Sequence, residues 1–195
     1  MFLRATWSVV LLIVALVTNY YANVYTSITA SNSVTDLILD RIPVVDVHYV
    51  FIYGAGFFIL ALIAFLMYEP RDIPFVVKSI ALFLVVRSFF MILTHIAPPI
   101  VGSHGYGYSA LDVVSSGDDL FFSAHAGLPF MLMLIYWKRL WLRSFYAIST
   151  LIGAGSVLLG HLHYSIDVFS AFFIAYGIYM ISTKFFDKDL ELFLS

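Results

Sequence analysis

Long apolar stretches constrain the fold of this sequence more than any other feature. The first of them, residues 6–29, contains no charged residue. A membrane-spanning helix needs about 20 apolar residues, and a mean hydropathy of +0.97 with 11% charged residues is typical of a chain surrounded by lipid. The sequence therefore predicts an all-α polytopic membrane protein, a single domain over residues 1–195 with six transmembrane helices. The predicted spans are residues 6–29, 47–68, 74–97, 120–137, 144–159 and 161–183.

Lysines and arginines indicate how these six helices are oriented. If successive loops alternate across the membrane, Arg4, Arg71, the basic cluster at 138–143 and the basic C-terminal segment share one side. The loops of the other side carry only Arg41. The positive-inside rule makes the basic side cytoplasmic. We therefore expect both termini inside the cell and an integral protein of the plasma membrane.

Two polar clusters interrupt the apolar stretches, one near the start of the fourth predicted helix and one near the start of the sixth. Ionisable groups are costly inside a bilayer, and proteins usually retain them there for function. Both helices start from the outer side in this topology, so the clusters meet at one level. The sequence thus predicts an active site on the extracytoplasmic face. Its candidate residues are Asp119, Ser123 and His125 in the first cluster, and His163 and Asp167 in the second, which also contains His161.

The residue types in these clusters suit phosphoryl transfer. Residues four apart share one helix face, so Asp167 can accept a hydrogen bond from one ring N–H of His163, fix its tautomer and leave the other nitrogen as a nucleophile. His125 can supply the proton that a leaving alkoxide needs. The positive N-terminal ends of the two helices favour a phosphate anion.

These residues also carry a family resemblance. The motifs are Asp119-x-x-x-Ser123-x-His125 and His163-Tyr-Ser-Ile-Asp167-Val168. Together they resemble the third and fourth motifs of the sphingomyelin synthase family, a branch of the type 2 phosphatidic acid phosphatase superfamily with six membrane helices.

The resemblance implies a role for each catalytic residue. His163 is the nucleophile that becomes phosphorylated, Asp167 orients it, and His125 protonates the departing lipid alcohol. We also expect Asp119 and Ser123 to bind the substrate. His161 occupies the first position of the family's His-x-His-Tyr pattern, and the resemblance implies no role for it.

The sequence departs from the family pattern at three points. Ala124 stands where the family's Ser-Gly-His motif has glycine. The lysine-plus-arginine-proline motif of the broader superfamily is absent, as is its serine-arginine pair, since Ser156 is followed by Val157. These absences favour the synthase-like branch over a general phosphatase.

Arg87 is the best candidate for a phosphate-binding cation. It lies within the third predicted span, and a guanidinium group binds phosphate through two parallel hydrogen bonds. A structural ion pair with Asp40 or Asp46 is the alternative.

The predicted function is transfer of a phospho-head group from a phospholipid donor to a lipid alcohol, with water as an alternative acceptor that would make the protein a phosphatase. We expect membrane lipids as partners, no cofactor, no metal ion and no nucleic acid.

A zinc site is less favoured, because the phosphohistidine arrangement explains the same residues. A proton-coupled transporter would show internal repeats and midplane binding groups, and neither is visible in the sequence. An inactive lipid-binding scaffold is the remaining alternative, since Ala124 departs from the family motif.

We assign no catalytic role to the other histidines. We interpret His48, His95 and His104 as interfacial residues, and give a cation–π pocket built from Tyr106 or Tyr108 little weight.

Overall fold

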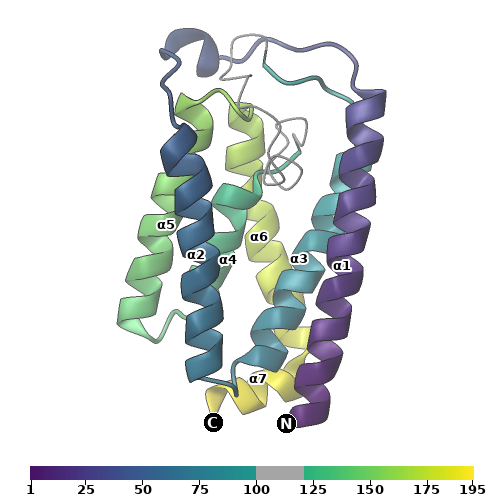
Figure 1. Ribbon diagram of the computed structural model, residues 1–195, viewed down its shortest axis with the longest axis vertical. Helices are drawn as coiled ribbons and strands as arrows, with labels where there is room; N and C mark the ends of the chain where they lie inside the picture. The colour runs from purple at the N-terminus through teal and green to yellow at the C-terminus, as the bar shows by residue number, and fades with distance from the viewer. Residues whose placement is uncertain (100–120) are drawn as a thin grey trace.

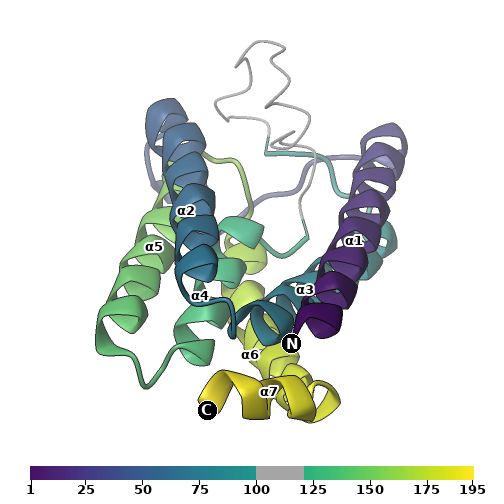
Figure 2. The same cartoon turned by 60° about the horizontal axis from the view of Figure 1, so that its bottom comes forward.

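Helices make up the whole architecture of the part of the chain that the structure describes. The computed structural model describes residues 1–99 and 121–195, and these two ranges contain no strand. The predicted all-α class is confirmed. Helices α1 to α6 run lengthwise in one bundle, and α7 lies across its end (Figures 1 and 2). Their bounds are α1 Phe2–Thr29, α2 His48–Tyr68, α3 Ile73–Leu93, α4 Ala124–Ile135, α5 Leu140–Leu159, α6 Ser165–Phe185 and α7 Asp187–Leu194, with a 3₁₀ helix, η1, at Leu39–Arg41.

The fourth predicted span differs from the others in length. Among the described residues, five helices are long and apolar enough to cross a membrane, namely α1, α2, α3, α5 and α6. Helix α4 has 12 residues, which makes it about 18 Å long at 1.5 Å per residue, against the roughly 30 Å of a hydrocarbon core. It begins only at Ala124 because the backbone of Ser123 is extended, with ψ 120°. The predicted span 120–137 is thus a short apolar helix, packed between α5 and α6 (Figure 1).

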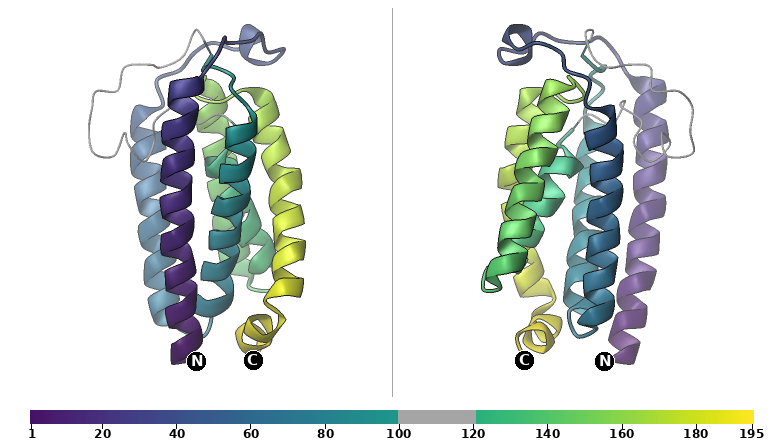
Figure 3. Two further views of the ribbon diagram at one scale, coloured as in Figure 1. Left: turned by 90° about the vertical axis from the view of Figure 1, so that its right-hand side faces the viewer. Right: turned by 60° about the vertical axis from the view of Figure 1, so that its left-hand side comes forward.

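Helix α1 packs along α3 (Figure 3). Its buried face carries small side chains seven residues apart, at Ser8, Ala15 and Ala22. Small residues let two helix backbones approach closely, which is how helices associate in lipid without a hydrophobic driving force. The other faces of α1 are apolar and exposed. We therefore expect α1 to face lipid everywhere except along α3.

Helices α3, α4 and α6 meet at Gly127. A Cβ atom built on this glycine would lie 3.1 Å from the ring of Phe83 on α3 and 3.3 Å from the Cβ of Ala171 on α6. Phe83 and Ala171 are fully buried. Close packing at this point places the first turn of α4 beside the first turns of α6.

Both termini lie at one end of the bundle (Figure 3), and ion pairs of basic residues join the elements there. Arg4, on α1, lies 3.5 Å from Asp189 on α7, and Lys78 on α3 also pairs with Asp189. Arg139 binds both carboxylate oxygens of Asp72, at 2.9 and 3.3 Å. The sequence did not predict α7, whose buried Asp189 ties α1 and α3 together at this end.

Candidate active site

His163 and Asp167 face each other where α6 begins. Nδ1 of His163 lies 3.6 Å from Oδ2 of Asp167, and the two side chains are 9% and 4% exposed. The same carboxylate oxygen accepts a hydrogen bond of 2.9 Å from the backbone N–H of Tyr164. Because Nδ1 faces the carboxylate, Nε2 is the ring nitrogen of His163 that does not face Asp167.

The local backbone around His163 differs from the prediction. The sixth helix was expected from residue 161, but α6 begins at Ser165, so His163 lies in the link between α5 and α6. The physical reason is that His161 adopts a left-handed conformation, with φ 50°, and the backbone of Tyr164 is extended, with ψ 156°. The proximity of His163 to Asp167 therefore arises from a short turn and not from a shared helix face.

His161 itself is buried, and its Nε2 atom has no hydrogen-bond partner among the residues that the structure describes. Non-glycine residues with positive φ are strained and are found most often near functional sites. A second strained residue, Phe122 with φ 31°, precedes Ser123 in the other polar cluster. Both clusters thus contain a left-handed residue within two positions of a candidate site residue.

A main-chain hydrogen bond joins the two polar clusters. The N–H of Ser123 donates to the carbonyl of Asp167 over 3.1 Å. Ser123 is fully buried at the N-cap of α4, and within the described ranges its hydroxyl has no hydrogen-bond partner. The structure therefore brings Ser123 next to Asp167, although 44 positions separate them in the sequence.

His125 lies in the first turn of α4 and is held on two sides. Its ring stacks on Phe51 of α2, with ring centroids 4.2 Å apart. On the other side α5 passes so close that a Cβ atom built on Gly153 would lie 2.1 Å from the carbonyl oxygen of His125. Burial, together with the neighbouring side chains of His163 and Arg87, lowers the pKa of His125 to about 3. Three of the predicted residues, from α3, α4 and the α5–α6 link, are therefore close enough to interact.

Arg87 is buried at the same level of the bundle. Its Nε donates a 3.2 Å hydrogen bond to the carbonyl of Phe122, and its Nη1 contacts Oδ1 of Asn19 at 3.2 Å and the sulfur of Met91 at 3.0 Å. The guanidinium group therefore supports the strained residue just before Ser123. Of the alternative partners, Asp40 is exposed in η1, and Asp46 accepts a hydrogen bond from the backbone N–H of His48.

Several candidate residues fall in the segment that is not described. Asp119, His104, Tyr106 and Tyr108 all lie outside the described residues. In the two described ranges no group of three or more histidine, cysteine, aspartate or glutamate side chains is arranged to hold a metal ion.

Comparison with known proteins gives one match. Residues 117–184 match the family model of the PAP2 superfamily C-terminal domain. The match supports the type 2 phosphatidic acid phosphatase superfamily. It covers just over a third of the chain and includes both polar clusters, and it does not single out the sphingomyelin synthase-like branch. Searches of curated proteins and of solved structures gave no match. In general terms, the superfamily match supports an enzyme of the lipid phosphatase or phosphotransferase type.

The structure also shows groups near this site that sequence reasoning missed. Asp36, in the connection between α1 and α2, accepts a 2.7 Å hydrogen bond from the N–H of Ser165, the first residue of α6. The backbone N–H groups of Tyr164 and Ser165, at the start of α6, therefore donate to the carboxylates of Asp167 and Asp36. The sequence predicted that this helix end would bind phosphate, and these two N–H groups already bind carboxylates instead. No pattern marked Asp36, because its role depends on a contact across 129 positions.

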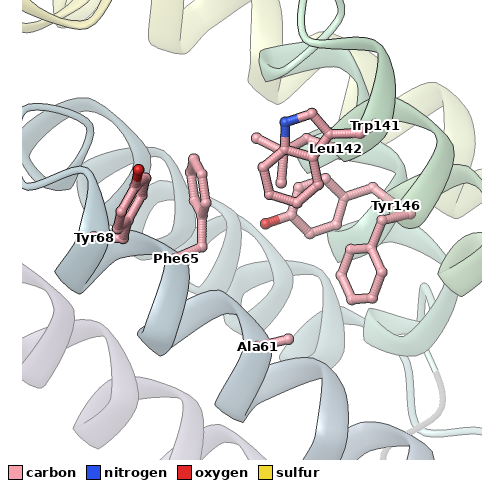
Figure 4. Close-up of a pocket in the computed structure, with 7 residues that line it drawn as sticks. Ala61, Phe65, Tyr68, Trp141, Leu142 and Tyr146 are labelled. Carbon is pink, nitrogen blue, oxygen red and sulfur yellow. The ribbon is translucent and has the colours of Figure 1, made fainter.

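An apolar cavity of about 340 Å³ lies away from these residues, between α2 and α5 near the basic end. Figure 4 shows Phe65 and Tyr68 of α2 opposite Trp141 and Tyr146 of α5. Its lining provides no acid, base or cation for phosphoryl transfer, so we assign no catalytic role to it. The lining residues are Ala61, Phe65, Tyr68, Trp141, Leu142, Phe145 and Tyr146.

Proposed function

We propose that this protein transfers a phospho-head group from a phospholipid to a lipid alcohol through a phosphohistidine intermediate on His163. The observation that carries the proposal is the buried pair of His163 and Asp167, close to His125, inside the segment that matches the superfamily model. A histidine whose Nδ1 faces a carboxylate keeps the other nitrogen basic and correctly oriented.

The first half-reaction forms the intermediate. Nε2 of His163 attacks phosphorus, and the bond from phosphorus to the oxygen of the lipid alcohol breaks. His125, protonated when the phosphate anion is bound, donates its proton to the leaving alkoxide, which departs as a neutral alcohol. The negative charge of the phosphate favours the proton that burial of the His125 ring opposes. Asp167 stabilises the positive charge that develops on the His163 ring.

The second half-reaction returns the enzyme to its starting state. The hydroxyl of the acceptor attacks phosphorus, and His125, now neutral, takes the proton of that hydroxyl. The phosphorus–nitrogen bond breaks, which restores His163. All atoms and charges balance without a metal ion or cofactor.

Groups at the start of α4 are proposed to bind the phosphate. The buried hydroxyl of Ser123 points to this role, since it has no partner in the described part of the chain. The positive end of the α4 dipole lies at the same place. Arg87 contributes positive charge close to His125. Asp119 is proposed to bind the substrate as well, on the sequence motif alone.

Water is the acceptor in a second candidate function, lipid phosphate hydrolysis, because the matched superfamily includes phosphatases. In either case we propose that the site faces the outside of the plasma membrane. The starts of α4 and α6 lie toward the end of the bundle opposite the two termini (Figure 1). Arg4, Lys78 and Arg139 form their ion pairs nearer the end with the termini, which the positive-inside rule makes cytoplasmic.

The deciding experiment follows the head group. Purified protein is reconstituted in vesicles with ³²P-labelled phosphatidylcholine, phosphatidylethanolamine or phosphatidic acid, each with and without ceramide. Transfer of label to ceramide supports the transferase, and release of water-soluble label in both conditions supports the phosphatase. An acid-labile ³²P label on the protein that is absent from His163→Ala supports the intermediate. No turnover of any of these donors, together with dissipation of a pH gradient by the protein, would favour a transporter instead.

A further inference from the structure

The connection between α1 and α2, residues 30–47, forms hydrogen bonds with the segment after α3 and with the end of α5. Near its start, the N–H of Ser31 donates to the carbonyl of His95 over 2.7 Å. Near its end, the N–H of Val45 donates to the carbonyl of Leu159, the last residue of α5, over 2.8 Å. A Cβ atom built on Gly160 would lie 2.5 Å from the side chain of Val47. The connection therefore fixes the α5 end of the link that contains His163.

Asp36 fixes the other end of this link. One carboxylate oxygen accepts hydrogen bonds from the N–H groups of Ile38 and Leu39, at 2.8 and 3.1 Å, and the other accepts from the N–H of Ser165 at 2.7 Å. Burial opposes ionisation of Asp36, but the hydrogen bonds from the N–H groups of Leu39, Ser165 and Ile38 outweigh it and lower the pKa of the carboxyl. Asp36 is therefore a buried, ionised group that joins η1 to the start of α6.

Tyr164 adds a second connection beside Asp36. Its hydroxyl accepts a hydrogen bond from the N–H of Val34 at 3.1 Å and donates one to the carbonyl of Ala97 at 2.8 Å. Its ring packs with Leu39 in a small buried cluster. The residues just after His163 thus contact both the α1–α2 connection and the segment that follows α3.

We propose that Asp36 is a positioning residue for His163, acting through Ser165 and Tyr164 to hold the nucleophile against Asp167. The inference rests on the proposed role of His163. The link between α5 and α6 contains a left-handed residue, His161, and a strained backbone persists only when its surroundings hold it. Asp36 supplies such a constraint at the start of α6. Its carboxylate oxygens are occupied by backbone N–H groups, so it acts on His163 through the backbone.

The test compares Asp36→Asn with Asp40→Asn. The first change turns one carboxylate oxygen into an NH₂ group, which faces an N–H donor at Ser165 or at η1 and cannot accept its hydrogen bond. The second makes the same chemical change four residues later, at an exposed position. Tyr164→Phe removes the neighbouring connection with a smaller change. All variants are assayed well below their unfolding temperatures, in single-turnover experiments with ³²P-labelled phosphatidylcholine or whichever labelled donor the wild type turns over.

For Asp36→Asn we expect phosphohistidine formation to slow about 100-fold, the scale of a 1 Å misplacement of a reacting group, with little change in KM. Hydrogen–deuterium exchange should increase over residues 160–166 in this variant and stay unchanged in Asp40→Asn. A variant that merely lost stability would instead show a lower unfolding temperature with unchanged rate and exchange in its folded fraction. That result would overturn the inference.

Failure of the inference and failure of the proposed function give different results. If His163→Ala retains activity, the nucleophile is wrong, whatever Asp36→Asn does. If His163→Ala is inactive while folded Asp36→Asn matches Asp40→Asn in rate and exchange, only the positioning role is wrong. Should Asp36→Asn fail to fold, Tyr164→Phe decides: slowed chemistry with faster exchange over 160–166 supports the connection, and wild-type behaviour in both measurements refutes it.

Discussion

Replacing Gly153 with alanine should disable the enzyme without touching a catalytic side chain. The added Cβ would lie 2.1 Å from the carbonyl oxygen of His125, whereas ordinary contacts of a Cβ atom begin near 3.4 Å. The backbones of α4 and α5 must therefore separate by about 1.3 Å at this point. Overpacking of this kind costs about 1–3 kcal/mol of stability, and displacing His125, the proposed general acid, by about 1 Å should cost about 100-fold in rate.

The neighbouring Gly155 provides a matched control. It lies on the same helix, and a Cβ atom built there meets nothing within 4 Å. Gly155→Ala should therefore keep full activity and unfold at the same or a slightly higher temperature, because alanine favours helix over glycine. The assay is turnover of a labelled phospholipid in reconstituted vesicles, with thermal unfolding measured in parallel. If Gly153→Ala were as active as Gly155→Ala, the close approach of α5 would not set the position of His125.

Further predictions address the chemistry and the orientation. His163→Ala should abolish turnover while leaving the protein folded, and Asp167→Asn should lose most of the rate because the neutral amide no longer favours the reactive tautomer; full activity in either variant would contradict the assigned role. Arg87→Lys should lower the rate, and Arg87→Ala more so, because an ammonium group cannot replace the fork of the guanidinium; an unchanged KM and rate in Arg87→Ala would make this arginine dispensable. A cysteine at exposed Thr35 should react with a membrane-impermeant thiol reagent in intact cells and one at Ser144 should not, with no native cysteine to interfere; the reverse pattern would place the site inside. Activity should survive chelation, and loss that is restored by added zinc or magnesium would point to metal ligands.

Much of the fold could be predicted because lipid imposes a simple rule on the sequence. A spanning helix must satisfy its own backbone hydrogen bonds and present apolar side chains, so uncharged stretches such as residues 6–29 mark helices directly. The rule fails where protein replaces lipid around a helix. Helix α4 is surrounded by its neighbours, so hydropathy over residues 120–137 could not show that only 12 residues are helical.

The candidate site could be predicted in its residue types but not in its construction. The sequence places His163 four positions before Asp167, and the structure finds the two side chains close together. The helical reason given for that proximity was wrong, because hydropathy cannot reveal the left-handed backbone of His161. Asp36 and Gly153 could not be found either, since their importance depends on contacts with segments far away in the sequence.

The hydrogen bond from the N–H of Ser123 to the carbonyl of Asp167 positions the two polar clusters through main-chain atoms, while their side chains carry the proposed chemistry. Main-chain atoms join the two polar clusters, and every non-proline residue has these atoms. A substitution at either position therefore does not remove the atoms that form this hydrogen bond. If the proposed function holds, a few side-chain substitutions could change the acceptor or the head group while this main-chain hydrogen bond is kept.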